Sequence, residues 1–215
     1  MDLCKRMLWL LLTGMFLAVV ACGGSTDRPT FQPLPTPTTP PNLVAFTDES
    51  NSFAIKYPPD WTLELSQMNA IESFMKDVIS GNTDDMSVEN IGVVFLSIDP
   101  TEEFVLGIAV ESLPLSNMTV DEYNEASDKF ARELTPSTKI NRTAHVVVDG
   151  RPSIISDSEF ELSDLFEGEN EKQRDIQLVT IQGKTAWIVT CSIPKEALEI
   201  VETCDALVRT FRILQ

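Results

Sequence analysis

The chain has 215 residues, 33 acidic and 16 basic, and its formal net charge is −17 at pH 7. A surface of this sign repels phosphate backbones, so nucleic acid is not expected as a partner. Because the chain has a single histidine, neither a His-based zinc site nor a hydrolytic triad is expected.

The first 21 residues have the order of an export signal. Lys5 and Arg6 precede an apolar run over residues 7–20, which is shorter than the roughly 20 residues that span a bilayer. The Val19-Val20-Ala21-Cys22 sequence that follows resembles the lipobox of bacterial lipoproteins. This resemblance implies cleavage before Cys22 and acylation of that cysteine. It predicts an extracytoplasmic protein that is lipid-anchored to the bacterial cell membrane. The alternative is plain secretion, because small residues before Cys22 also suit an ordinary signal peptidase.

Residues 22–41 are predicted to form a tether. Six prolines lie between Pro29 and Pro41, interleaved with threonines. Proline fixes φ and lacks an N–H donor, so this segment favours polyproline II over a packed core. The remaining residues 42–215 have the size of one globular domain. The leader carries Lys5, Arg6 and Asp2, so its removal makes the chain one unit more negative, which favours a domain held off an anionic membrane.

The first half of the domain mixes strands with one helix. Residues 53–58 alternate as a strand, a Pro-Pro-Asp turn follows, and a second strand is expected over 61–65. Apolar residues at helical spacing predict a helix over 68–79 that stops near Gly81. Two further strands are expected near 92–98 and 105–113.

The middle of the domain contains a helix and a hairpin. Thr119-x-x-Glu122 is typical of a capping box, so a helix is expected from there to about Leu134. Its inward face would carry Tyr123, Ala126, Phe130 and Leu134. Strands are predicted over 138–148, 152–162 and 175–182, and Asp149-Gly150 indicates a tight turn between the first two.

The last strand, 185–192, is apolar on both faces, with Trp187 and Val189 on one and Ala186 and Ile188 on the other. A strand buried on both sides needs helices above and below the sheet. Pro194 is expected to open a final helix over 195–208, before Phe211-Arg212-Ile213-Leu214 closes the chain. The prediction is an α+β fold, an α-β-α sandwich around a largely antiparallel sheet.

Two cysteines remain in the folded domain, because Cys4 leaves with the leader and Cys22 is the lipidation site. Cys191 on the last strand and Cys204 on the last helix come roughly level, and Cys204 lies on an apolar stripe that faces the sheet. Two readings stay open: a disulfide, or two buried free thiols. Redox catalysis is not expected, since there is no C-x-x-C motif.

The domain opening carries a family resemblance. Ser52-Phe53-Ala54-Ile55-Lys56-Tyr57-Pro58-Pro59-Asp60-Trp61 resembles the G-F-S-x-x-Y-P-x-x-W opening of PsbP-like domains, and the F-R-I ending after Asp205-Ala206-Leu207 is similar too. The resemblance implies an α-β-α sandwich and a family made mostly of binding or assembly factors. It carries over no metal ligand and no photosynthetic role. From the residues themselves, Phe53, Ile55, Tyr57 and Trp61 are expected to be packing residues.

Candidate chemistry in the domain is sparse. His145 has no nucleophile-elbow motif beside it, so we interpret it as a satisfied or exposed strand residue. Two acidic clusters could collect Ca²⁺ but lack a recognisable loop. For the cluster that begins at Asp157, cross-strand pairing with Lys172 and Arg174, or solvation, is a better explanation than a Ca²⁺ site. These clusters are Asp84, Asp85 and Glu89, and then Asp157, Glu159, Glu161, Asp164, Glu167, Glu169 and Glu171.

No catalytic residue, metal ligand or cofactor is therefore predicted. The leading hypothesis is a non-catalytic module, tethered to the membrane through the lipid at Cys22, that engages a protein partner or assists assembly. The alternative is a lipoprotein that binds an acidic solute or a divalent cation.

Overall fold

The computed structural model describes residues 40, 42–64, 91–101, 103–113, 117–164 and 171–214. The predicted leader, Cys22, almost all of the tether, the 68–79 helix and the Asp84–Glu89 cluster lie outside these residues. Among the residues described, no helix has both the length and the apolar character needed to cross a membrane.

Within the described part of the chain, the main sheet has seven strands, and every neighbouring pair is antiparallel. Their order across the sheet is β3-β4-β5-β9-β8-β7-β6. The strands are β3 (Thr62–Leu63), β4 (Ile91–Ile98), β5 (Val105–Ser112), β6 (Lys139–Val148), β7 (Arg151–Glu161), β8 (Lys172–Gln182) and β9 (Thr185–Pro194). The prediction of a largely antiparallel sheet is confirmed.

A second sheet of three strands has the order β1-β2-β10. Its strands are β1 (Val44–Asp48), β2 (Phe53–Tyr57) and β10 (Arg212–Ile213), so the two ends of the domain meet in it. The predicted turn after β2 is present, since the backbone N–H of Trp61 donates to the carbonyl of Pro58 at 3.2 Å. Phe53 and Ile55 are buried and Tyr57 and Trp61 pack against the same core, which confirms their role as packing residues.

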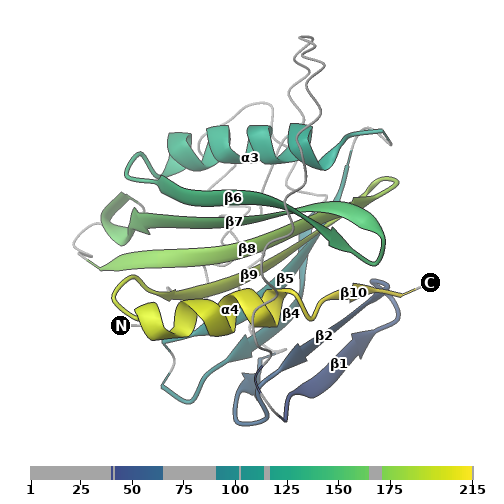
Figure 1. The fold of residues 1–215 in the computed structure, drawn as a ribbon, viewed down its shortest axis with the longest axis horizontal. Helices are drawn as coiled ribbons and strands as arrows, with labels where there is room; N and C mark the ends of the chain where they lie inside the picture. Colours follow the sequence, from purple (N-terminus) through teal and green to yellow (C-terminus); the bar gives the residue numbers. More distant parts are fainter. Residues whose placement is uncertain are drawn as a thin grey trace.

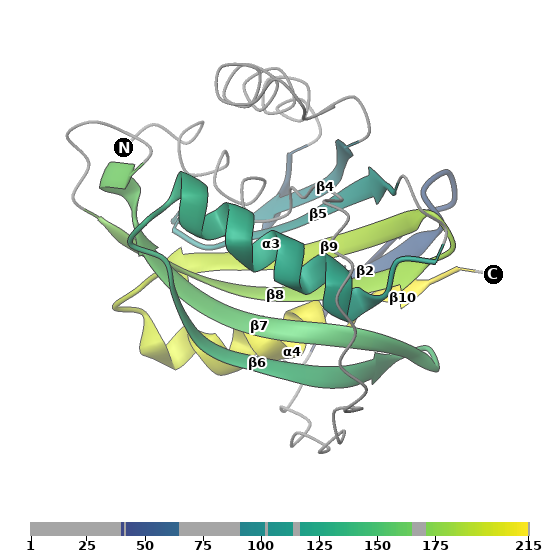
Figure 2. The same cartoon turned by 90° about the horizontal axis from the view of Figure 1, so that it is seen from above.

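The two α-helices among the described residues lie on opposite faces of the main sheet (Figures 1 and 2). Helix α3 (Val120–Leu134) crosses β7 and β8, and helix α4 (Val201–Val208) contacts β8 and β9 on the other face as well as β2. A short 3-10 helix, η2 (Leu162–Asp164), follows β7, and another, η3 (Leu198–Ile200), precedes α4.

Strand β9 lies in the middle of the sheet and is buried from Ala186 to Ile193. Ala186 and Ile188 belong to the core under α3, whereas Trp187 and Val189 belong to the core under α4 and the small sheet. This is the alternation that the sequence predicts for a strand covered on both faces.

Both local motifs of the middle region form as expected. Thr119 caps α3 by accepting from the backbone N–H of Glu122, and the Glu122 carboxylate accepts from the backbone N–H of Thr119 in return. The hydrogen bonds that the backbone N–H and the hydroxyl of Thr119 donate to this carboxylate lower the pKa of Glu122. In the turn between β6 and β7, Asp149 and Gly150 have φ of 49° and 77°, as a two-residue hairpin turn requires.

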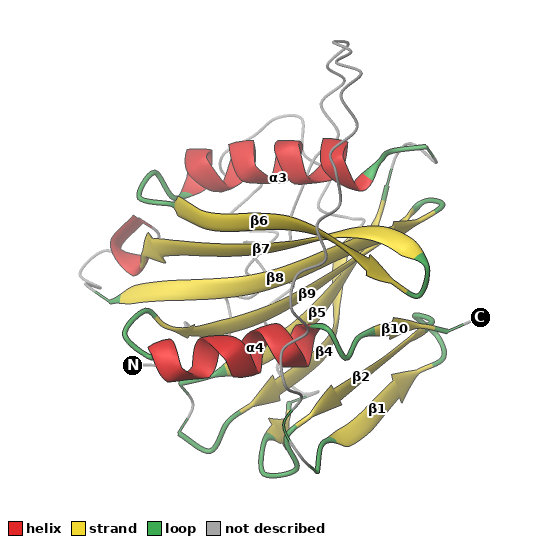
Figure 3. Ribbon diagram, viewed as in Figure 1, coloured by secondary structure: helices red, strands yellow, loops and turns green. Residues whose placement is uncertain are grey.

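The expectation for Pro194 is wrong. Pro194 pairs with Gln173 as the last residue of β9, and the N–H of Lys195 still donates to the carbonyl of Lys172. The chain therefore stays extended as far as Pro194, and a turn and the 3-10 helix η3 follow before helix α4 begins at Val201 (Figure 3). Strand β8 also begins three residues before the predicted start at 175, because its first residues extend the ladder with β7.

Candidate functional site

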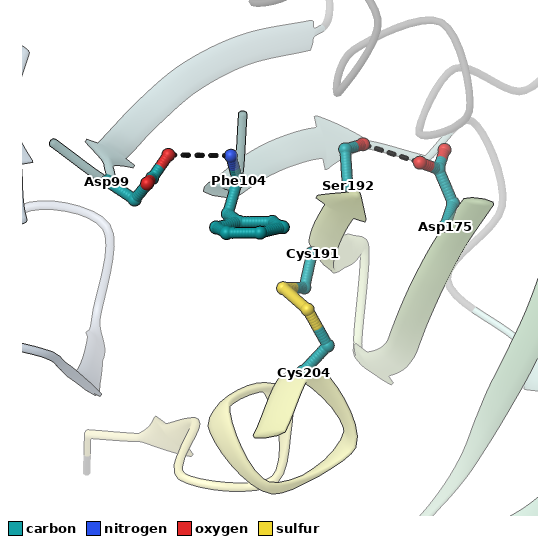
Figure 4. The surroundings of a disulfide bond; sticks show 6 residues. All are labelled: Asp99, Phe104, Asp175, Cys191, Ser192 and Cys204. Carbon is teal, nitrogen blue, oxygen red and sulfur yellow. Dashed lines mark hydrogen bonds between the residues drawn. A yellow bond between two sulfur atoms is a disulfide. The ribbon is translucent and has the colours of Figure 1, made fainter. Parts of the chain in front are cut away.

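The two cysteines of the domain form a disulfide between strand β9 and helix α4. The Cα atoms of Cys191 and Cys204 lie 5.5 Å apart, and both residues have no exposed surface. Figure 4 shows the bond on one side of β9, while the next residue, Ser192, points to the other side and donates to Asp175. The same view shows Asp99 accepting from the backbone N–H of Phe104 in the turn before β5. The sequence left open a disulfide or two buried free thiols, and the structure contains the disulfide.

The acidic residues of β7 lie on the α4 side of the sheet and face cations. Asp157 accepts two hydrogen bonds from Arg174, at 2.8 and 2.6 Å. Glu159 lies between two lysines, 2.9 Å from Lys139 Nζ and 2.6 Å from Lys195 Nζ. The hydrogen bonds that the lysines donate lower the pKa of Glu159, and the hydrogen bonds that Arg174 donates to Asp157 raise the pKa of that arginine.

Glu161 completes the row by pairing with Lys172 at 2.7 Å, and the hydrogen bond raises the pKa of that lysine. The predicted pairing with Lys172 and Arg174 is thus observed. Asp164 is also engaged, because its carboxylate accepts from the backbone N–H of Ser137 at 2.8 Å. Within the described ranges, no three His, Cys, Asp or Glu side chains converge so as to hold a metal ion. Glu167 and Glu169, like the Asp84–Glu89 cluster, lie outside these ranges.

One ion pair and one backbone hydrogen bond fasten α4 and the C-terminal strand to the β6–β7 hairpin. Asp205 of α4 accepts from Arg209 at 3.0 Å and lies 3.7 Å from Arg142 of β6. Asp149 in the hairpin turn accepts from the backbone N–H of Ile213 at 2.9 Å. The charged groups on this face therefore hold elements together.

His145 lies on β6 and pairs with Asp121 in the first turn of α3, with 2.5 Å between Nε2 and Oδ1. The structure thus places it as a partnered strand residue, in line with its interpretation from the sequence. The pair joins the start of α3 to the outermost strand of the main sheet.

Three buried polar pairs on the α3 side of the sheet were not singled out by the sequence. Tyr123 donates to Glu111 at 2.6 Å, Ser192 donates to Asp175, and Gln177 donates to Thr190 at 3.2 Å. Burial, together with the nearby charge of Glu111, raises the pKa of Tyr123 well above its ordinary value. The sequence does contain a signal for the two pairs between β8 and β9. Polar residues occupy every second position of these apolar strands, namely Asp175 and Gln177 on β8 and Thr190 and Ser192 on β9.

Together, the antiparallel sheet between two helices and the appended small sheet define an α+β domain of the PsbP-like fold. Cyanobacterial PsbP (CyanoP) from Synechocystis sp. PCC 6803 is similar to it, with a TM-score of 0.54 and 13% identity, over 91% of this chain and 98% of that one. The fold implied by the opening motif is thereby confirmed.

Two other solved structures are more distant. The chain is similar to LpqN, a protein involved in cell envelope biogenesis of Mycobacterium tuberculosis, with a TM-score of 0.45 and 9% identity over 84% of this chain and 90% of LpqN. It is also similar to the Saccharomyces cerevisiae Ran-binding protein Mog1p, with a TM-score of 0.46 and 12% identity over 81% and 96% of the two chains. No family model matches the chain, and no curated protein matches it either.

Proposed function

We propose that this protein is a non-catalytic binding or assembly module, anchored by the lipid on Cys22 to the outer face of a cytoplasmic membrane, where it engages a protein partner. The observation that carries the proposal is the order of parts along the chain. A lipobox-like Val19–Cys22 sequence is followed by a proline-rich tether and then by a PsbP-like domain.

The interactions of the domain support the binding part of the proposal. Enzymes present reactive groups in a site that substrate can reach. Here His145, Asp157 and Glu159 each bind a partner side chain from a neighbouring element. The disulfide, which suits an oxidising compartment, fixes α4 to the sheet. We expect a domain held together by such bonds to engage a protein through its surface.

The tether supports the anchored part of the proposal. If fully extended at about 3.1 Å per residue, residues 23–41 would span on the order of 60 Å. Bacterial lipoproteins carry more than one acyl chain, and two chains hold a protein stably at a membrane where one barely does. Such a domain could reach a partner beside its own anchor.

Chemical crosslinking in intact cells tests the proposal. The wild-type chain is expected to yield a defined crosslinked product with a membrane or envelope protein, and Cys22→Ala is expected to remove most of it by releasing the domain from the membrane. Addition of millimolar Ca²⁺ to the purified domain is expected to leave its melting temperature unchanged. A Ca²⁺-dependent rise in melting temperature without a crosslinked partner would favour the cation-binding alternative instead.

A further inference from the structure

The sulfur atoms of the disulfide are shielded by the main sheet on one side. Neither Cys191 nor Cys204 has any exposed surface. The residues that pair with Cys191 on the two neighbouring strands are Leu106 of β5 and Ile176 of β8, and both are fully buried. A thiolate has to contact a sulfur atom of a disulfide in order to exchange with it. No such contact can be made through the sheet.

Helix α4 shields the bond on the other side (Figure 4). Its residues 204–208 are buried without a break, and five successive residues of an α-helix point in every direction around its axis. Among the described elements, β8, β9 and β2 contact this helix, and Arg142 of β6 lies 3.7 Å from Asp205. Exchange at the bond therefore requires that α4 first move away from the sheet.

The part of the chain that carries α4 can move without breaking the main sheet. We define the C-terminal segment as residues 198–214, which contain η3, α4 and β10. Within the described part of the chain, this segment contributes no strand to the seven-stranded sheet, and its strand in the small sheet, β10, is two residues long. Proteins open locally in cooperative units of this kind at a lower free energy than global unfolding. Release of the segment would uncover the bond while every ladder of the main sheet stays paired.

The C-terminal segment is also fastened by contacts that lie away from the cysteines. In β10, Ile213 pairs with Phe53 of β2 and is buried in the core on the α4 side. Its backbone N–H donates to the carboxylate of Asp149 at 2.9 Å. Weakening these contacts should raise the population of the released segment without altering the sulfur atoms or the strands around them.

From these observations we propose that the C-terminal segment and its disulfide form a redox latch, in which the bond forms or breaks only while the segment is released from the sheet. When the latch closes, the thiols of Cys191 and Cys204 lose two protons and two electrons, which reduce an oxidant of the disulfide class to its two thiols. When it opens, a dithiol reductant reverses this exchange. The oxidant must therefore act before the segment docks, and the folded domain keeps its bond in a reducing solution.

The kinetics of reduction of the full chain test the latch. The chain is treated with dithiothreitol in native buffer and, separately, in concentrated urea. Free thiols are trapped by alkylation, and mass spectrometry follows the peptides that contain Cys191 and Cys204. We expect reduction in native buffer to be at least about a hundredfold slower than in urea, because only molecules with a released segment react.

Two variants distinguish release of the segment from unfolding of the whole domain. Ile213→Ala should speed reduction in native buffer at least about tenfold, because it removes a buried side chain that holds the segment down. Tyr123→Phe is the matched control, since Tyr123 belongs to the core on the opposite, α3 side of the sheet. Its rate should stay within about twofold of the wild-type rate, because local release does not depend on that core.

A milder variant covers the case in which Ile213→Ala does not fold. Asp149→Asn removes the charge from the group that accepts from the Ile213 N–H, and it should speed reduction about fivefold, since hydrogen bonds to charged groups are stronger than those to neutral ones.

Three results would overturn the proposal. Similar rates in native buffer and in urea would show that dithiothreitol reaches the bond in the folded domain. An acceleration by Tyr123→Phe as large as that by Ile213→Ala would show that the whole domain must unfold first. A rate that neither Ile213→Ala nor Asp149→Asn changes would show that some other motion uncovers the bond.

Discussion

Glu159 shows how single residues stabilise this domain. Its side chain is only 12% exposed and pairs with Lys139 of β6 and Lys195 after β9, so one carboxylate joins three segments of the chain. The pKa of Glu159 is lowered in the folded state by these hydrogen bonds. The ionised carboxylate therefore contributes stability above its ordinary pKa of 4.5, and this contribution is lost as the pH falls through the lowered folded pKa.

Glu159→Gln is expected to reduce the free energy of unfolding at pH 7 by about 1 kcal/mol, a modest value because solvent screens the exposed lysines. The difference from wild type should shrink below about pH 4, since protonation removes the same charge from the wild-type side chain. Urea unfolding at several pH values measures this. Glu161→Gln is the control, as that side chain is 45% exposed and has one lysine partner, and it should change stability much less. A Glu159→Gln deficit that stays constant down to pH 3 would contradict the assignment.

Tyr123→Phe tests the buried pair on the other face of the sheet. Tyr123 is 1% exposed and Glu111 is 5% exposed, so removing the hydroxyl takes a donor from a buried carboxylate. We expect a loss of about 1–3 kcal/mol in the free energy of unfolding. The chain's other tyrosine provides the control: Tyr57 packs its ring against Phe95, and Tyr57→Phe should be nearly neutral. Equal effects of the two changes would show that the Tyr123 hydroxyl contributes nothing specific.

At the scale of elements, the disulfide fixes helix α4 against the centre of the main sheet. Cys191 and Cys204 are 13 residues apart in sequence, and closing a loop of this size stabilises a folded chain by about 3 kcal/mol. Replacing both cysteines by alanine should lower the free energy of unfolding by about that amount, measured by denaturant unfolding. Adding a reductant should lower the stability of the wild-type chain toward the variant and leave the variant unchanged. A variant as stable as the oxidised wild type would contradict this role.

Most elements within the described residues could be predicted because their signals are local. The capping box at Thr119 and Glu122, the Asp149-Gly150 turn and the two-sided burial of β9 all depend on residues close together in sequence. The start of α4 could not be predicted in this way. Pro194 is compatible with the first turn of a helix or with the end of a strand, and the choice is made by Gln173, a residue of β8 that pairs with it.

Among the charged residues, too, contacts within one strand pair could be predicted, and contacts between elements distant in sequence could not. That Asp157, Glu159 and Glu161 share one face of a strand follows from the two-residue period of a strand, and Arg174 and Lys172 could be expected opposite them. The contact of Lys195 with Glu159 and the contact of Arg142 with Asp205 depend on how α4 and the segment before it fold back over the sheet. No pattern within one strand or helix contains that information.

At the scale of the whole molecule, a folded PsbP-like domain follows a predicted tether and lipid anchor. The proposed function requires that the domain be held at the membrane where its partner lies. That requirement depends on one modification, the acylation of Cys22.

The mass of the intact protein extracted from washed membranes tests this requirement most directly. We expect a chain that begins at Cys22 and carries more than one acyl chain, and we expect Cys22→Ala to be absent from those membranes. An unmodified chain that begins at Cys22 and is recovered wholly in the soluble fraction would contradict it.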